Sequence, residues 1–448
     1  MTLMSQAWAA RRLTNVSYVS DLRIVLRGRD FRRLFGTRLV SQFSDGIFQF
    51  AVAGYAFFSP EKQTSVADVA AAFAVLLLPY SIVGPFAGVF IDRWSRRQIL
   101  VIAPLIRASL LLLSALVVVV QAPDWLFYAT AFGVLGVNRF FLSALGASLP
   151  HVVPKDTLMI ANAVTPTSGT VVTFVGAGLG FVMRWILGPD HIGTAVILLT
   201  SGVIFASSAM VARKMSRELL GPSFDPDRPQ ARDAVRNVLS GLVDGVRYVA
   251  HRRGPAAALG SMAAHRVLYG MSLGMVLMLY RYYFTTDTEV GLMALGGVVA
   301  TSGLGYFAAA FLTPWATQHF RIETWIPITL ALCGVLEFLL CVPFQQWGFL
   351  VTGFVTGVLG QSGKICTDVV VQRGIADAYR GRVFSIYDLL FNGMMVVGVS
   401  LSALLLPADG RSFLVLALIT VLYLVAAAAY RLAVLPVVRQ AEPLTVKP

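Results

Sequence analysis

Charged side chains stand inside several long apolar stretches of this chain, and they are the residues best suited to do chemistry there. Arg38 and Asp45 are seven residues apart, so two helical turns place both on one face. Lys364 and Asp368 are i,i+4 neighbours that can neutralise each other. A charge at bilayer depth costs at least ~2.5–3.5 kcal/mol, so each needs a partner or a water-filled cavity. The remaining embedded charges are Arg107, Arg139, Arg266, Glu337 and Asp388.

The apolar stretches that must position these charges determine the class of protein. Hydrophobic residues make up 57% of the 448 and charged residues only 13%, with a mean hydropathy of +0.73. A soluble domain usually has about a quarter of its residues charged, and a membrane-spanning helix needs ~20 apolar residues. We therefore predict an all-α polytopic membrane protein. The predicted spans are 34–58, 66–91, 98–121, 125–149, 160–187, 192–212, 255–284, 289–315, 323–343, 346–372, 381–406 and 411–436.

The distribution of Lys and Arg predicts the orientation of these twelve spans. One side receives the basic N-terminal segment, the long middle loop and the C-terminal tail. The opposite side has only Lys62 and Arg411 in its loops, with Arg184 and Arg281 near span ends. By the positive-inside rule we expect a multi-pass protein of the cell membrane with both termini cytoplasmic. The net charge of +13 is then a topology signal, and we expect no nucleic-acid partner.

The longest polar segment divides the spans into two sets of six. We predict a basic cytoplasmic segment at 1–33, an N-terminal bundle at 34–212, a linker at 213–254, a C-terminal bundle at 255–436 and a tail at 437–448. Two six-helix halves suggest an internal duplication, which is the layout of many secondary transporters. Residues 17–35 combine one apolar face with basic side chains. They fit either a helix along the inner leaflet or a solvated basic tail.

One short polar stretch, GPFAGVFIDRWSRRQ at 84–98, separates the second and third spans. Its residues match a loop signature of the major facilitator superfamily at Gly88, Asp92, Arg93, Arg96 and Arg97, with Ser95 where Gly is usual. With twelve spans in a 6+6 arrangement, the chain resembles that superfamily. Three looser stretches are similar to its branch of macrolide-type efflux pumps, an enterobactin exporter and a lysophospholipid transporter. They are Ser41-x-x-x-Asp45, LPHVVPKDTLMIANA at 149–163 and RGRVFSIYD at 380–388.

The resemblance implies roles for several charges. It implies a cytoplasmic gate in which Asp92 and the arginines meet Arg380, Arg382 and Asp388; the alternative is that the arginines only set topology. It also implies that spans one, four, seven and ten line a central cavity, which singles out Asp45, Arg139, Arg266 and Lys364. Asp45 is either a proton-coupling carboxyl or a permanent ion pair with an arginine. Arg107 and Glu337 fall in spans that pack peripherally, and we interpret both as structural.

Enzyme chemistry is not indicated by any motif. The stretch GVLGQSGKI at 357–365 lacks the first Gly and the final Ser/Thr of a phosphate-binding loop, and the five histidines form no zinc or hydrolase motif. We expect no cofactor, so transport must draw on a proton gradient or the membrane potential. We predict a proton-coupled exporter of a hydrophobic or amphipathic small molecule, acting as a monomer among membrane lipids. The alternatives are a lysolipid or lipid flippase and a transport-inactive sensor or assembly partner.

Overall fold

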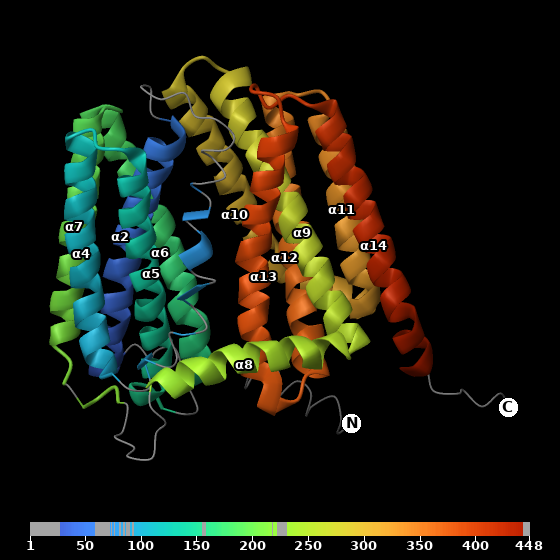
Figure 1. Cartoon of the computed structure of the whole chain (residues 1–448), viewed down its shortest axis with the longest axis horizontal. Coiled ribbons are helices and arrows are strands. Elements are labelled where there is room, and N and C mark those ends of the chain that lie inside the picture. The colour runs from blue at the N-terminus through green and yellow to red at the C-terminus, as the bar shows by residue number, and fades with distance from the viewer. Residues whose placement is uncertain are drawn as a thin grey trace, which may run out of the picture. The chain divides into compact units, whose positions relative to one another are not determined.

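The structure is a computed structural model that describes residues 27–58, 94–154, 158–216, 218–221 and 231–441, with isolated positions between 72 and 91. These residues form helices joined by short turns (Figure 1). The helices are α2 (Arg29–Phe58), α4 (Arg96–Val119), α5 (Asp124–Ser148), α6 (Leu158–Leu187), α7 (His191–Arg213), α8 (Ala231–Ala250), α9 (Arg253–Met278), α10 (Thr288–His319), α11 (Ile322–Cys341), α12 (Gln346–Gly374), α13 (Asp377–Leu405) and α14 (Phe413–Ala441). A 3-10 turn, Leu149–His151, follows α5, and a π-helical turn, Leu279–Tyr283, follows α9.

Eleven of the twelve predicted spans coincide with helices of the part that the structure describes, while most of the second, 66–91, lies outside it. Ten of these helices are long and apolar enough to cross a membrane. Helix α2 is the least apolar of the eleven spans because it carries the embedded Arg38 and Asp45 as well as a charged first turn. Much of the helical surface is apolar, as lipid requires: Val203 is 71% exposed and Leu414 is 79% exposed.

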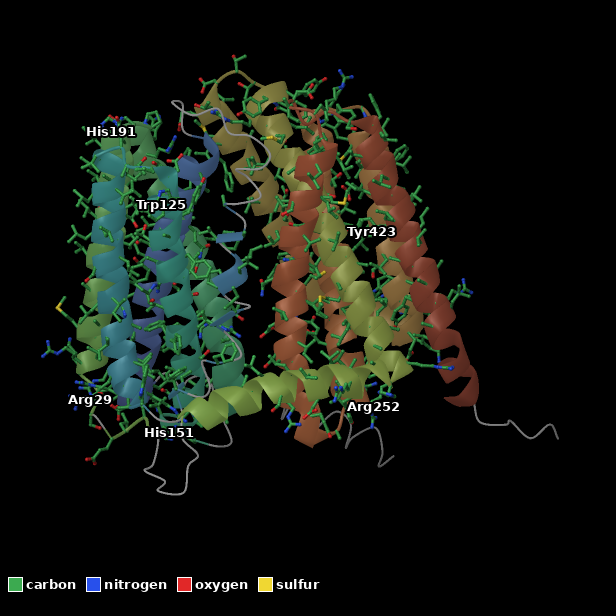
Figure 2. The ribbon with its side chains drawn as sticks, in the orientation of Figure 1. Arg29, Trp125, His151, His191, Arg252 and Tyr423 are labelled. Atoms are coloured by element: carbon green, nitrogen blue, oxygen red, sulfur yellow. The ribbon has the colours of Figure 1, made fainter. Side chains whose placement is uncertain are left out.

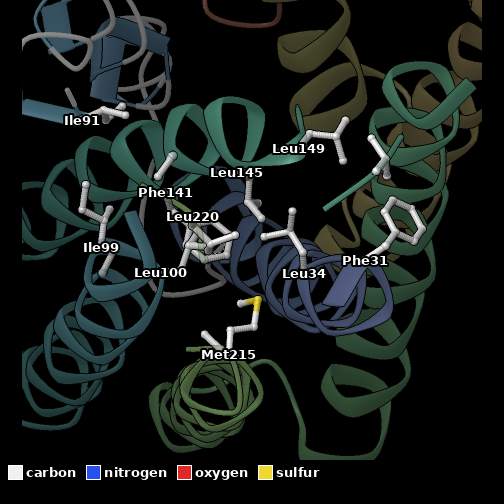
Figure 3. Close-up of a cluster of buried hydrophobic side chains, with 14 of the residues drawn as sticks. Phe31, Leu34, Ile91, Ile99, Leu100, Phe141, Leu145, Leu149, Met215 and Leu220 are labelled. Atoms are coloured by element: carbon white, nitrogen blue, oxygen red, sulfur yellow. The ribbon is translucent and has the colours of Figure 1, made fainter. Parts of the chain in front are cut away.

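Helix α2 begins five residues before the predicted boundary of the first span. The reason is burial, because Phe31 and Leu34 are each only 1% exposed within an apolar cluster (Figure 3). This cluster joins the ends of α2, α4 and α5 to the segment after α7. Its largest members are Phe31, Leu34, Ile91, Ile99, Leu100, Phe141, Leu145, Leu149, Met215 and Leu220. Residues 29–35 therefore belong to helix α2; residues 17–26 of the proposed surface segment lie outside the described residues.

The helices form two compact units. Unit 1 contains α2 up to Tyr55 together with α4–α7, and unit 2 contains α8 from Val235 together with α9–α14. In unit 1, Arg29 and His151 lie at one end of the helices, and Trp125 and His191 lie towards the other (Figure 2). In unit 2, Arg252 lies at the end crossed by α8, and Tyr423 lies in the body of α14 (Figure 2).

Corresponding helices pack together in both units, as an internal duplication predicts. In unit 1, α4 packs against α5 and α7; in unit 2, the equivalent α11 packs against α12 and α14. The equivalent pairs α2–α6 and α9–α13 are both close-packed through glycines. A Cβ on Gly176 would collide with the Phe43 carbonyl of α2, and one on Gly398 would collide with the Val267 carbonyl of α9. Small residues let membrane helices approach closely, because packing drives their association.

The glycine contact between α2 and α6 yields a testable expectation. Gly176→Val should force the two helices apart and destabilise the protein by about 1–3 kcal/mol, the usual range for overpacking. The matched control is Gly178→Val on the same helix, where an added Cβ meets nothing within 4 Å. Thermal unfolding of the purified proteins in detergent should show a loss of stability for the first variant alone. Equal melting temperatures would contradict the close contact.

Candidate functional site

An ion pair is buried at the centre of unit 1. Arg107 of α4 and Asp45 of α2 are 0% and 1% exposed, and the Arg107 guanidinium donates a hydrogen bond to Asp45 Oδ1. The second carboxylate oxygen accepts from Gln42 Nε2 at 2.8 Å. The carboxylate is therefore satisfied on both oxygens, one of them by a full charge. Such a geometry stabilises the ionised form of the pair and restricts exchange with water.

The other contacts of Arg107 extend this network to four helices. Arg107 Nη1 donates to Ser41 Oγ at 3.3 Å and to Asn138 Oδ1 of α5 at 3.1 Å. The guanidinium carbon lies 3.7 Å from the centre of the Phe205 ring of α7, a cation–π contact. Ser41 and Asp45, which the sequence singled out for their spacing, thus bind the same guanidinium. The arrangement connects α2, α4, α5 and α7 through one cation.

Arg38 and Arg139 occupy less enclosed positions in unit 1. Arg38 is half-buried and lies against Gly169 of α6, where a Cβ would come within 2.9 Å of its Nε. It remains within electrostatic reach of Asp45 but forms no ion pair with it. Arg139 is half-buried on α5. The partner of Asp45 is therefore Arg107 rather than the neighbouring Arg38.

A pocket in unit 2 contains two of the three remaining predicted transport residues, Arg266 and Lys364. It is lined by residues of α9, α10, α11, α12 and α13, among them Ser261, His265, Arg266, Tyr306, Thr329, Cys333, Lys364 and Phe391. Lys364 Nζ lies 2.9 Å from Asp368 Oδ2, the ion pair that their spacing predicts. Both side chains are just over a quarter exposed, unlike the Asp45–Arg107 pair. Lys364 also faces the ring of Phe391 at 5.5 Å.

Arg266 is more deeply buried than the other predicted transport cations, Arg38, Arg139 and Lys364. It is only 7% exposed, yet it forms no ion pair with an acid of the described chain. Its Nε donates to the Phe391 carbonyl at 2.8 Å, and its guanidinium carbon lies 4.0 Å from the centre of that ring. A second guanidinium nitrogen contacts Met395 Sδ. Carbonyl and ring contacts leave the cation only partly compensated, so the pocket suits an anionic or electron-rich group.

The predicted gate arginines bind helix ends within unit 1. Arg96 Nη1 donates to the carbonyls of Ala147, in the last turn of α5, and of Leu220, at 3.0 and 3.2 Å. Arg97 Nη2 donates to the carbonyl of Arg213, the last residue of α7, at 2.8 Å. Helix C-termini present unsatisfied carbonyls and partial negative charge, so cations there are stabilising. These arginines therefore fasten the ends of α5 and α7.

The other gate candidates are only partly described. Gly88, Asp92 and Arg93 lie outside the described residues, as does the side chain of Arg380. Arg382 lies on α13 facing α8, with Nη1 3.9 Å from Asp244 Oδ2. Asp388, further along α13, accepts from Asn392 Nδ2 through its carbonyl at 3.0 Å. The gate between the two halves stays a prediction.

Metal chemistry has no support in the part of the chain that the structure describes. No group of three or more His, Cys, Asp or Glu side chains there could hold a metal ion. The three cysteines, Cys333, Cys341 and Cys366, are buried and free. They pack as small apolar residues in unit 2.

Comparison with known proteins identifies the family. An uncharacterized MFS-type transporter of Mycobacterium tuberculosis is 36% identical over 394 residues, which cover 86% of each chain. The chain belongs to the major facilitator superfamily of transporters. Macrolide efflux protein A of Streptococcus pyogenes is 23% identical over 388 residues, covering 84% of this chain and 88% of that protein. No family model matches the chain.

Solved structures of superfamily transporters share the fold. A peptide transporter in complex with alafosfalin aligns with a TM-score of 0.67 at 12% identity, over 94% of this chain and 98% of its own. A bacterial homologue of the lysosomal transporter Spinster aligns with a TM-score of 0.66 at 13% identity, over the same shares. These alignments confirm the twelve-helix, all-α membrane fold. As a superfamily member, the chain is a multi-pass membrane transporter and not an enzyme.

Three residues of the unit 1 ion-pair network and the unit 2 pocket were not identified from the sequence. Arg107 was interpreted as structural, without a partner assigned, and it is the partner of Asp45; Asn138 was not singled out. In unit 2, His265 lines the pocket, and its Nδ1 shares a hydrogen bond with the Tyr423 hydroxyl at 3.1 Å. The signal for Arg107 was present, because a lone arginine in an apolar span needs an acid, and Asp45 was one of few available.

The ion pair of unit 1 makes a prediction that separates the two interpretations of Asp45. If the pair is permanent, Asp45→Asn leaves the Arg107 charge buried without an acid, which costs about 3–5 kcal/mol. The partly exposed Lys364–Asp368 pair in unit 2 is the matched control, and Asp368→Asn should cost about 0–1 kcal/mol. Thermal unfolding in detergent measures both. A stability of Asp45→Asn equal to that of the wild type would instead indicate a protonated Asp45, as the coupling interpretation requires.

Proposed function

We propose that this chain is a proton-coupled exporter of hydrophobic or amphipathic small molecules that works by alternating access. Membership of the superfamily makes it a secondary transporter. Similarity to proteins named for macrolide efflux supports export as the direction. We further propose that it acts in the cell membrane as a monomer, with both termini cytoplasmic. Its energy would come from the proton gradient or the membrane potential, without a cofactor.

The observation that supports the cargo class is the pocket of unit 2. Its walls combine apolar and aromatic side chains, such as Met262, Leu330 and Phe391, with the cation of Arg266. Ligand pockets are mostly apolar, with a few polar groups that fix orientation. An amphipathic molecule would place its apolar body along the walls and its polar end at Arg266.

A second candidate function is the flipping of lysolipids. Arg266 favours it, because an arginine without an acidic partner is suited to bind a phosphate through two parallel hydrogen bonds. A lysolipid has such a head group and one apolar chain. Both candidates use the same pocket, and they differ in the charge of the polar end that it receives.

Transport by everted membrane vesicles from cells expressing the chain tests these proposals. With an imposed proton gradient, we expect accumulation of fluorescent amphipathic dyes that a protonophore abolishes. Movement of a fluorescent lysolipid that does not depend on the gradient, without dye transport, would favour the flippase. The absence of any flux, together with a stable complex with another protein, would instead favour a sensor.

The variant Arg266→Gln tests whether the polar end of the substrate that binds in the pocket is anionic. A charge-assisted hydrogen bond is worth about 1.5–3 kcal/mol, so this variant should weaken the apparent affinity for anionic lysolipid about tenfold or more. The affinity for cationic dyes should not fall. The matched control is Arg253→Gln, which removes an exposed cation at the first residue of the same helix. Equal effects of the two substitutions would contradict a substrate contact at Arg266.

A further inference from the structure

Glu337 of α11 is buried in unit 2 without compensation of its charge. It is 4% exposed, and its Oε1 accepts a hydrogen bond from the hydroxyl of Ser272 on α9. Its Oε2 is buried and has no hydrogen-bond partner. No Lys, Arg or His of the described chain forms an ion pair with it. A carboxylate in this position would keep one oxygen entirely unsatisfied within a membrane span.

Among the described residues, the groups that surround Glu337 include no Lys or Arg. On its own helix, Cys333 and Cys341 lie one turn to either side. On α14 the neighbouring titratable group is Tyr423, which is bonded to His265 of α9. On α9, the cation nearest in sequence to Ser272 is Arg266. Its guanidinium is directed to Phe391 and Met395 of α13. On α12, Thr352 bonds Cys341 and carries no charge.

The other two embedded acids in the described transport sites have cations. Asp45 is bound by Arg107, and Asp368 is bound by Lys364. Glu337 alone of these three is enclosed with a single neutral donor. A protonated carboxyl fits such a site, because its hydroxyl can lie at Oε2 while Oε1 accepts from Ser272. The ionised form fits poorly, since burial without a counter-charge disfavours it.

From this geometry we propose that Glu337 is a proton-binding site and that it carries the coupling proton. The site adjoins the pocket, because Cys333, one turn from Glu337 on α11, lines the pocket. Water entering from the pocket would accept the proton from Oε2 and later return one to it. That Glu337 binds a proton follows from the buried carboxyl alone, whereas its coupling role also depends on the proposed function. Two measurements test proton binding and coupling separately.

Infrared spectroscopy of the purified full-length protein tests proton binding. A protonated carboxyl has a carbonyl stretching band that a carboxylate lacks, and this band should disappear as the pH is raised. Glu337→Gln should remove the band, while the matched control Asp368→Asn should leave it. Gln resembles the neutral acid in size and charge, so we expect the variant to fold. A band of wild-type intensity in Glu337→Gln would overturn the proposal.

Ser272→Ala provides an independent reading of the same band. This substitution removes the only hydrogen bond to the carboxyl, so the band should persist and move to higher frequency. The shift identifies the band with Glu337 even if Glu337→Gln fails to fold. An unchanged frequency in Ser272→Ala would overturn the assignment.

Dye transport by everted vesicles tests the coupling role. Glu337→Gln should move dye down its own gradient at the wild-type rate but lose the accumulation driven by protons. Gradient-driven accumulation in this variant would overturn the coupling role. Whether Glu337 binds a proton would then be decided by the infrared result. If the wild type itself shows no proton-driven transport, the proposed function fails, and the coupling role fails with it. The infrared bands still decide whether Glu337 binds a proton.

Discussion

A charge that leaves water must be neutralised inside the protein, and in unit 1 this requirement is met around one guanidinium. Arg107 of α4 is fully buried, and its side-chain contacts come from α2, α5 and α7. The directional contacts to Arg107 fix how these helices are aligned along their axes, because dispersion forces alone would allow one helix to slide along another. The pair with Asp45 therefore fixes the geometry of the unit as well as neutralising two charges.

Glycine contacts and terminal contacts complete this arrangement. Gln42 lies one turn from Asp45 on α2 and donates to it. The close approach of α2 and α6 at Gly176 lets Thr173 of α6 donate to the Gln42 side-chain carbonyl at 3.5 Å. At the helix ends, Arg96 and Arg97 bind the last carbonyls of α5 and α7 above the apolar cluster that contains Phe31. The same arginines that predict orientation thus also hold the helices together.

The sequence predicted the spans well because hydropathy is a local property of the chain. The Lys364–Asp368 pair was likewise predictable, since helical spacing brings i and i+4 together. The partner of Asp45 was not, because Arg107 lies 62 residues away and only helix packing decides which of several arginines reaches it. The interpretation of Glu337 as structural could not take its surroundings into account for the same reason. Its unusual feature is the absence of a nearby cation in the described unit, which no local pattern encodes.

The two units keep equivalent helix pairings and glycine contacts but differ in the balance of their buried charges. Unit 1 encloses the Asp45–Arg107 pair, whereas in the described part of unit 2 Glu337 and Arg266 are buried without an ion-pair partner. The half that holds the unpaired groups and the pocket is the one whose side chains a substrate would meet. Chimaeras that exchange the halves of two relatives would inherit their cargo from the C-terminal parent.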